Sequence, residues 1–398
     1  MNGYKQALVE IWKWLKNQQK ANGGFPPYPQ FINEPATIAS ADFVGLLFRR
    51  CSIQNCGDLQ GAGDILEKTK KFISDMQLFD GGFAPNGDIY AIKDISFVES
   101  TASCITAFLV YLRSLNAEGQ SKASETKISI LRGVKYLLDT KAEDMWPNYT
   151  TTLKVEDEIF RFFPFIAAMR ALVLFFDLSD NLAFKKFISN RFIGNVLTVI
   201  QEGTRKIVDL LINKKYLPFS TSPQASISYV NTINALEVLI SVFNSDKIYK
   251  EDETIKKMKE AFHVGLSSIL DYTESNNDNM DEDVILLNIP SYPSKYTATY
   301  RRDLAISYVF SGTLLESKSI SIIKNISSIN SKEALTQMRN YVKAVADKEV
   351  RKMNKEKRYY SQERRFGVFV PAISATCLLF AILKNCILLQ GGGTTNEQ

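Results

Sequence analysis

The residues with the most chemistry to offer are three acidic side chains near the expected starts of apolar helices. They are Asp42, Glu99 and Asp157. A carboxyl group in a water-poor site can act as a general acid or base, and two carboxyl groups facing one cleft can hydrolyse a glycosidic bond. Acidic residues in a first helical turn also cap the helix and complement its dipole. We take all three as candidate catalytic residues, with capping as the alternative.

Arginines also stand at expected helix starts, where their charge opposes the helix dipole and therefore needs another reason. The two strings are Arg301-Arg302-Asp303 and Glu363-Arg364-Arg365. One reason is mutual neutralisation with the neighbouring acids, and the other is an anionic ligand held by guanidinium groups. Arg302 and Arg365 are expected to open adjacent inner helices. With flanking aromatics, the candidate ligand-binding residues are Arg161, Tyr300, Arg301, Arg302, Asp303, Tyr359, Tyr360, Glu363, Arg364 and Arg365.

Metal-ligating residues are sparse and scattered. His263 is the single histidine, and the five cysteines form no Cys-x-x-Cys pair. We therefore expect no metal site, no cofactor, and reduced thiols in a cytoplasmic protein. The acidic string Asp281-Glu282-Asp283 lies in a polar insert and is expected to be a solvated loop. No glycine-rich phosphate loop or nucleophile elbow is present.

One pattern recurs along the chain: an amphipathic helix, a turn rich in aromatic, Gly and Pro residues, and a more apolar helix. The expected pairs are residues 4–19 and 40–50, 64–76 and 99–115, 127–140 and 158–176, 184–214 and 226–243, 254–272 and 303–315, and 334–353 and 365–389. Such a period suits one helical hairpin per repeat.

The hydrophobic pattern assigns the two helices of each pair to different layers. First helices carry one apolar stripe, as in Ile65, Leu66, Phe72 and Ile73, whereas second helices are apolar nearly all round. The sequence therefore predicts an all-α fold, an (α/α)6 toroid with an apolar inner ring and an amphipathic outer ring. We expect one domain over residues 1–390 and a flexible tail at 391–398. Strands are expected only as a short ribbon around Val284–Leu287.

The second repeat resembles those of the prenyltransferase and terpenoid-cyclase superfamily. It carries Gln77, then Asp80-Gly81-Gly82-Phe83, then Glu99-Ser100-Thr101-Ala102, and the first unit is similar with Trp14, Gln18, Gly23-Gly24-Phe25-Pro26 and Ser40. The resemblance implies an α/α toroid, with glycines at positive φ and the aromatic residue filling the gap between outer helices. The zinc ligands and the Asp-x-Asp-Asp acid motif of that superfamily are missing.

Net charge and hydropathy exclude some classes of binding partner. The net charge of +5 is too small for a dedicated nucleic-acid binder. The apolar run 366–383 contains Pro371 and is short for a membrane span, so none is expected.

Three functions stay open. The first is a toroid without the standard catalytic motifs, which binds a small hydrophobic or anionic ligand, or a protein partner, through an aromatic and charged central cavity. The second is a divergent isoprenoid cyclase or lyase with an inner-ring carboxyl as acid. The third is a carbohydrate-active α/α-barrel enzyme with paired carboxylates.

Overall fold

The structure is a computed structural model, and part of the chain can be described from it. The described residues are 2–30, 34–48, 59, 61–85, 95–142, 145–147, 161–180, 182, 184, 187–221, 225–248, 251–275, 282–287, 296–326, 330–365 and 368–391. For residues 2, 282–287, 296–300, 363–365, 368–370 and 390–391 the description covers the backbone only.

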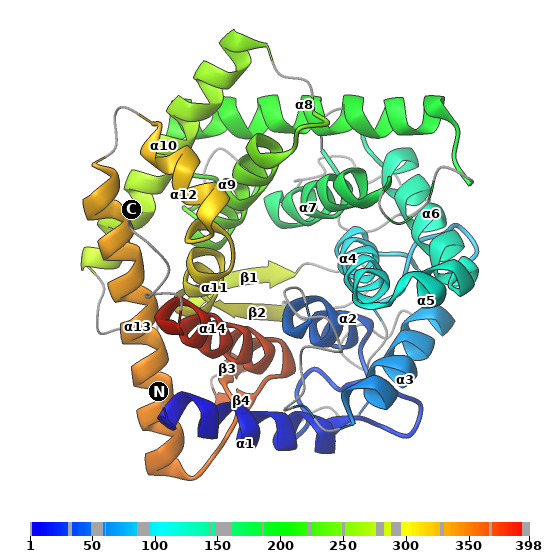
Figure 1. The fold of residues 1–398 in the computed structure, drawn as a ribbon, viewed down its shortest axis with the longest axis vertical. Coiled ribbons are helices and arrows are strands. Elements are labelled where there is room, and N and C mark those ends of the chain that lie inside the picture. Colours follow the sequence, from blue (N-terminus) through cyan, green and yellow to red (C-terminus); the bar gives the residue numbers. More distant parts are fainter. Residues whose placement is uncertain are drawn as a thin grey trace.

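Six helical pairs follow one another around a ring (Figure 1). The outer helices are α1 (Asn2–Gln18), α3 (Ala62–Asp75), α6 (Ser124–Asp139), α8 (Asn190–Lys214), α10 (Asp252–Ser275) and α13 (Ser331–Glu356). The inner helices are α2 (Thr37–Leu47), α4 (Val98–Ser114), α7 (Phe162–Leu178), α9 (Tyr229–Asn244), α11 (Arg302–Val309) with the π-helical segment Phe310–Leu314, and α14 (Ile373–Gly391). Short helices α5 (Ala117–Lys122) and α12 (Ser317–Lys324) lie in connections.

The inner helices contact one another in sequence order, and α14 closes the ring by packing against both α11 and α2. The outer layer is joined at the same place, where α1 contacts α13 and α14. Figure 1 shows this seam, with the last inner helix beside the first. The predicted all-α (α/α)6 toroid with an apolar inner ring is therefore confirmed.

Burial explains the two layers. In α7, Phe165, Ile166, Met169 and Leu172 are all fully or nearly fully buried, because an inner helix touches inner neighbours and outer helices at once. Outer helices such as α3 bury one face and leave the other to solvent. The sixth inner helix begins at Ile373 rather than at residue 365, so that expectation was wrong. Pro371 disfavours helix in the residue before it, and the preceding segment is extended instead.

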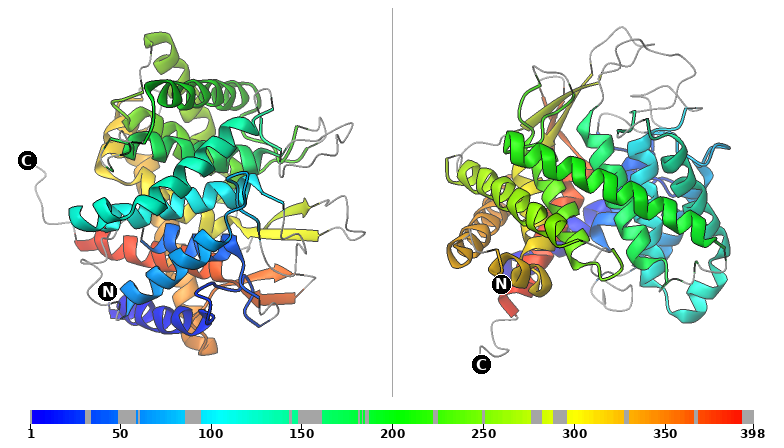
Figure 2. Two further views of the ribbon diagram at one scale, coloured as in Figure 1. Left: turned by 90° about the vertical axis from the view of Figure 1, so that its right-hand side faces the viewer. Right: turned by 90° about the horizontal axis from the view of Figure 1, so that it is seen from above.

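Two antiparallel ribbons stand on one face of the ring. Strands β1 (Glu282–Leu287) and β2 (Tyr296–Arg301) pair in the register Glu282 with Arg301. Strands β3 (Gln362–Arg365) and β4 (Val368–Pro371) form the second ribbon. Figure 2 shows both projecting from the same face, the ribbon side, where inner helices α11 and α14 begin. The first ribbon was expected from the sequence and the second was not.

The glutamine of the turn motif ties each turn to the next outer helix. The Gln77 Nε2 donates to the carbonyls of Gly81 and Ser129. In the first unit Gln19 has this role and donates to Gly23 and to Ile65. The comparison of the two units in the sequence placed Gln18 there, and it was wrong by one residue.

The two glycines of the turn are needed for different reasons. Gly81 has φ +92°, and a Cβ there would lie 2.5 Å from the Arg132 carbonyl oxygen. Gly82 has no positive φ, but a Cβ would lie 2.4 Å from that of Ser96. The expectation of positive φ therefore holds for the first glycine only. The aromatic residue Phe83 is fully buried and contacts Phe108 of inner helix α4, with ring centroids 6.0 Å apart.

In four of the repeats, a hydroxyl in the first turn of the inner helix bonds the preceding turn to that helix. The Thr101 Oγ1 accepts from the Phe83 N–H and donates to the Phe97 carbonyl. The same pair of bonds is made by Ser40, Thr232 and Thr376 in other repeats. These four hydroxyls therefore mark the same depth in their inner helices. Other residues of those helices can be placed by their distance along the chain from these hydroxyls. Among the described helices, none is long and apolar enough to cross a membrane.

Candidate functional site

Solvent reaches the ring interior along one stripe of each of several inner helices. Partly exposed residues recur there at a spacing of three or four, while their neighbours are buried. The stripes are Ile38, Asp42 and Leu46 on α2; Glu99, Ser103 and Thr106 on α4; Phe163, Ala167, Arg170 and Leu174 on α7; Arg302 and Ala305 on α11; and Ser374 and Leu378 on α14. This spacing puts each set on one helical face. Because the opposite faces pack on outer helices, these stripes line the interior.

Asp42 lies at the centre of the polar part of this lining. Its side chain interacts with Ser374 of α14 and with Arg170 of α7, and the thiols Cys104 of α4 and Cys377 of α14 lie near enough to be affected by its charge. Surrounding protein atoms deprive the carboxylate of water and raise its pKa to about 6, and only partial compensation comes from Ser374 and Arg170. A carboxyl with this pKa is protonated in part of its population near neutral pH.

A second set of polar groups continues across the ring. The Arg170 Nη2 lies 2.8 Å from the Glu237 Oε2 on α9, and the Thr313 hydroxyl donates to the Glu237 Oε1 at 3.1 Å. The Glu237 side chain is 1% exposed, whereas that of Arg170 is 29% exposed. Thr313 belongs to the π-helical segment, a rare geometry that often occurs at functional sites. Asp42, Ser374, Arg170, Glu237 and Thr313 together form what we call the central polar cluster.

The second predicted carboxylate, Glu99, faces the same interior from α4, the neighbour of α2. Glu99 precedes the first-turn hydroxyl residue Thr101 by two residues, and Asp42 follows Ser40 by two. Asp42 therefore lies one turn deeper, about 6 Å along the helix axis. The structure thus brings Asp42 and Glu99 to adjacent inward stripes. Asp157 lies outside the described residues.

Sequence reasoning missed Arg170, Glu237 and Ser374. A signal existed for the two charged residues, because each is the one charged side chain within the central turns of a strongly apolar helix. A charge at such a position must find a partner inside the protein. Ser374 gave no comparable signal, since serine is common in helix first turns.

Arg301 is buried and pairs with two carboxylates of the protein. Its Nε and Nη2 lie 2.8 and 2.6 Å from the two Asp303 carboxylate oxygens, and Nη2 also lies 3.0 Å from the Glu349 Oε1 on α13. The side chain is 1% exposed. Burial alone would raise the pKa of Asp303, but the Arg301 guanidinium holds it below its ordinary value. Arg301 thus joins the end of β2 to outer helix α13, which is the structural ion pair weighed in the sequence analysis.

Arg302 opens α11 as expected and is partly exposed on its inward stripe. Its guanidinium carbon lies 5.8 Å from the ring centroids of both Tyr229 and Tyr272, which stack at 4.1 Å. Arg161 immediately precedes α7 and bridges to Ser220 on the ribbon side. These contacts place both arginines near the same face.

The remaining ligand-binding candidates do not belong to the inner helices. The ring of Tyr360 contacts that of Trp14 on outer helix α1 in a tilted arrangement, with centroids 5.1 Å apart, and the neighbouring Tyr359 is partly buried. Glu363, Arg364 and Arg365 belong to β3, so Arg365 does not open an inner helix, and that expectation was wrong. The side chains of these three residues and of Tyr300 in β2 lie outside the described part.

The described residues that could bind a metal ion do not form a cluster. Among the described residues, no group of three His, Cys, Asp or Glu side chains could hold a metal ion. His263 lies on outer helix α10, and Cys104, Cys377 and Cys386 are buried free thiols. Glu282 and Asp283 lie in strand β1, so the loop expected there was wrong for these two residues.

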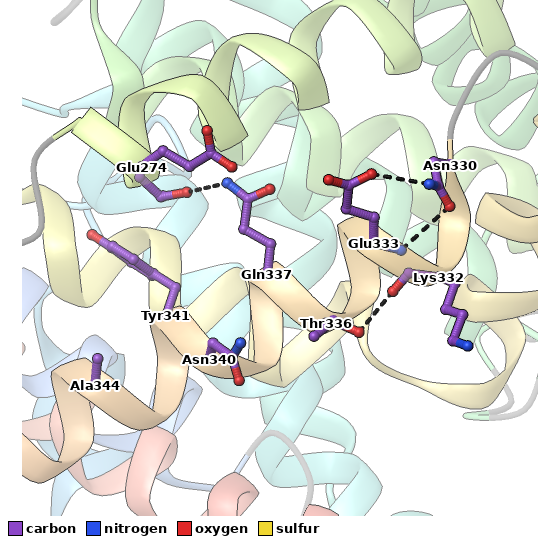
Figure 3. A pocket seen from close by; sticks show the side chains of 10 residues that line it. Glu274, Asn330, Lys332, Glu333, Thr336, Gln337, Asn340, Tyr341 and Ala344 are labelled. Carbon is purple, nitrogen blue, oxygen red and sulfur yellow. Dashed lines mark hydrogen bonds between the residues drawn. The ribbon is translucent and has the colours of Figure 1, made fainter.

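A groove of about 720 Å³ lies on the outside of the ring, between α10 and α13. Figure 3 shows that Asn330 pairs with Glu333 and that the Thr336 hydroxyl donates to the Lys332 carbonyl. Gln337 also donates to Thr273. Asn330 also accepts from the Glu333 N–H as the N-cap of α13. These groups complete helix ends, so the groove offers less chemistry than the ring interior.

Comparisons with solved structures return α/α-toroid enzymes, whereas the chain matches no protein-family model and no curated protein. An unsaturated glucuronyl hydrolase specific for heparin aligns with TM-score 0.57 and 8% identity, over 98% of this chain and 97% of that one. An α-1,6-mannanase of Salegentibacter sp. aligns with TM-score 0.56 and 8% identity, over 97% and 99%. A D-mannose isomerase gives TM-score 0.54 and 10% identity, over 96% and 97%. At such identities the likeness establishes the toroid fold.

Proposed function

We propose that this protein is a carbohydrate-active α/α-toroid enzyme in which Asp42 is the general acid. The carrying observation is a carboxyl group inside the ring whose burial raises its pKa to about 6. Such a group keeps a proton to donate near neutral pH, which an ordinary aspartate does not. The fold neighbours act on sugars, which supports this alternative over a toroid that only binds.

Glu99 is the proposed second carboxylate. It faces the same interior from the adjacent helix, one turn nearer the ribbon side. In this proposal Asp42 protonates the oxygen of the bond that breaks, while Glu99 accepts a proton from water or stabilises the positive charge that develops on the sugar. Arg170, Glu237 and Ser374 orient Asp42 and tune its proton affinity.

The test is turnover of a panel of chromogenic aryl glycosides and free reducing sugars as a function of pH. We expect kcat to fall as pH rises through about 6, because the acid form of Asp42 is lost. Asp42→Asn and Glu99→Gln should each reduce kcat by about 100-fold or more, while Asp209→Asn on the exposed face of α8 should not. Full activity in Asp42→Asn would refute the proposal. No turnover of any sugar would favour the ligand- or partner-binding toroid.

A second candidate is proton-initiated isoprenoid cyclisation. It is favoured by the apolar residues that flank Asp42 on the inward stripes, Ile38, Leu46 and Leu378, and by the turn that follows Gln77 with Asp80-Gly81-Gly82-Phe83. A single acid in apolar surroundings can protonate a double bond. Incubation with linear isoprenoids followed by mass spectrometry of extracted products distinguishes this chemistry, since cyclic products require it.

A further inference from the structure

Arg170 has more hydrogen-bond donors than the described residues use. A guanidinium carries five N–H donors, and the Nη2 of this group forms an ion pair with the Glu237 Oε2 at 2.8 Å that lacks hydrogen-bond geometry. Among the described residues, no hydrogen bond to the Arg170 guanidinium is present. The side chain is 29% exposed, on an inward stripe where solvent enters. These N–H donors are therefore available to a bound molecule.

Buried residues hold the Arg170 guanidinium in position. Glu237 is 1% exposed and accepts from Thr313, so the carboxylate that holds Arg170 is itself held. A guanidinium held in this way loses little side-chain freedom when a planar anion binds to it. Arg170 also lies close enough to Asp42 to affect its charge, so an anion on the guanidinium would place the rest of its molecule beside the proposed acid.

We propose that Arg170 binds a carboxylate of the substrate, so that the sugar on which Asp42 acts is a uronic acid. The binding of a carboxylate is argued from the geometry of Arg170, whereas the action of Asp42 on the bound sugar rests on the proposed function. A planar carboxylate matches a guanidinium edge with two parallel hydrogen bonds. Local charge favours a monoanion over a phosphate dianion, because Glu237 already balances Arg170 and Asp42 is neutral only while protonated.

The arrangement couples anion binding to the protonation of Asp42. Other charged groups of the interior are Glu99 on α4, Glu237 on α9 and Arg302 on α11, and the thiols Cys104 and Cys377 flank Asp42. An anion beside Asp42 disfavours its ionised form. By linkage, affinity for the anion must fall as pH rises and Asp42 ionises.

The experiment is calorimetric titration of the protein with D-glucuronate, with its neutral counterpart D-glucose, and with inorganic phosphate, at about pH 5 and about pH 7.5. At the lower pH we expect D-glucuronate to bind about ten-fold more tightly than D-glucose. Arg170→Met should abolish that preference, whereas Arg205→Met on the outside of α8 should keep it. Because Arg170→Met removes the cation that pairs with the buried Glu237, the double variant Arg170→Met/Glu237→Met serves as a folded alternative.

The outcomes separate this inference from the proposed function. A D-glucuronate preference that weakens at the higher pH, and loses this pH dependence in Asp42→Asn, supports the carboxylate site even if no sugar is turned over. Equal binding of D-glucuronate and D-glucose, or a preference that survives Arg170→Met, overturns it even if neutral glycosides are hydrolysed. Tighter binding of phosphate than of D-glucuronate also overturns the choice of a carboxylate.

Discussion

At the scale of single residues, the cost of burying Asp42 must be visible in the stability of the protein. The raised pKa means that, between about pH 4 and pH 6, the folded chain binds more protons at this position than the unfolded chain. The contribution of Asp42 to the free energy of unfolding therefore decreases as pH rises through this window, and the full cost is present above about pH 6.

Asp42→Asn removes that cost and retains an amide able to bond Ser374. We expect the variant to match the wild type near pH 4 and to be more stable by about 1–3 kcal/mol near pH 7. Urea denaturation at several pH values measures the difference, with Asp209→Asn as the surface control. Parallel stability curves for wild type and Asp42→Asn would show that the carboxylate is not desolvated.

Arg301 gives a second prediction at this scale. Arg301→Met leaves the carboxylates of Asp303 and Glu349 buried without their cation, which should cost about 3–5 kcal/mol. Replacing all three charged residues by apolar ones of similar size should recover most of that loss, because no uncompensated charge remains. Thermal unfolding of the single and triple variants measures both effects. A single variant as stable as the wild type would mean that solvent reaches the pair.

How much of the site the sequence could predict depends on where each charge lies in its helix. Asp42 and Glu99 were found because acids near the start of an apolar helix are visible in the linear pattern. Arg170 and Glu237 lie in the middle of apolar helices, and their pairing joins residues 67 positions apart on neighbouring helices. Nothing in local periodicity specifies which inward faces meet across a ring.

At the scale of elements, the turns between the two layers set the level of each inner helix. A first-turn hydroxyl binds the turn backbone in four of the repeats, so the inward stripes share a register. This register is what allows Ser374 on α14 to reach Asp42 on α2. The sequence predicted the helices and their layers from hydrophobic period. It did not predict β3 and β4, because the apolar residues of β4 continue without a break into the apolar helix that follows.

Gly61, which precedes α3, and the turn glycines Gly81 and Gly82 provide a test that separates backbone strain from lack of space. Gly61 has φ +80° and no atom within 4 Å of the place that a Cβ would occupy, so Gly61→Ala should cost about 1 kcal/mol from strain alone. Gly81→Ala adds an approach of 2.5 Å to the Arg132 carbonyl and should cost clearly more. Gly82→Ala meets Ser96 and Tyr136 without strain. The urea denaturation midpoints give the order of stability of the three variants. A Gly81→Ala variant as stable as Gly61→Ala would contradict the close approach to Arg132.

At the scale of the whole molecule, a closed ring should unfold as one unit. In an open array each repeat contacts only its neighbours and the ends can fray, whereas here α14 packs against α2. The three tryptophans report on opposite sides, with Trp12 and Trp14 at the seam and Trp146 buried in the third pair. In Trp146→Phe, and separately in Trp12→Phe/Trp14→Phe, fluorescence and helical circular dichroism should give one urea midpoint. A seam signal lost at lower urea than the helical signal would show that the ring opens first.

The seam also has a consequence for how the protein is made. Asp42 leaves the ribosome early, but Ser374 and the rest of α14 follow only after more than three hundred further residues. Until then the apolar flank of α2 that α14 covers stays bare, and the proposed acid lacks its serine. A nascent chain therefore cannot carry a finished site, and its uncovered α2 surface is a natural point for a chaperone to hold during synthesis.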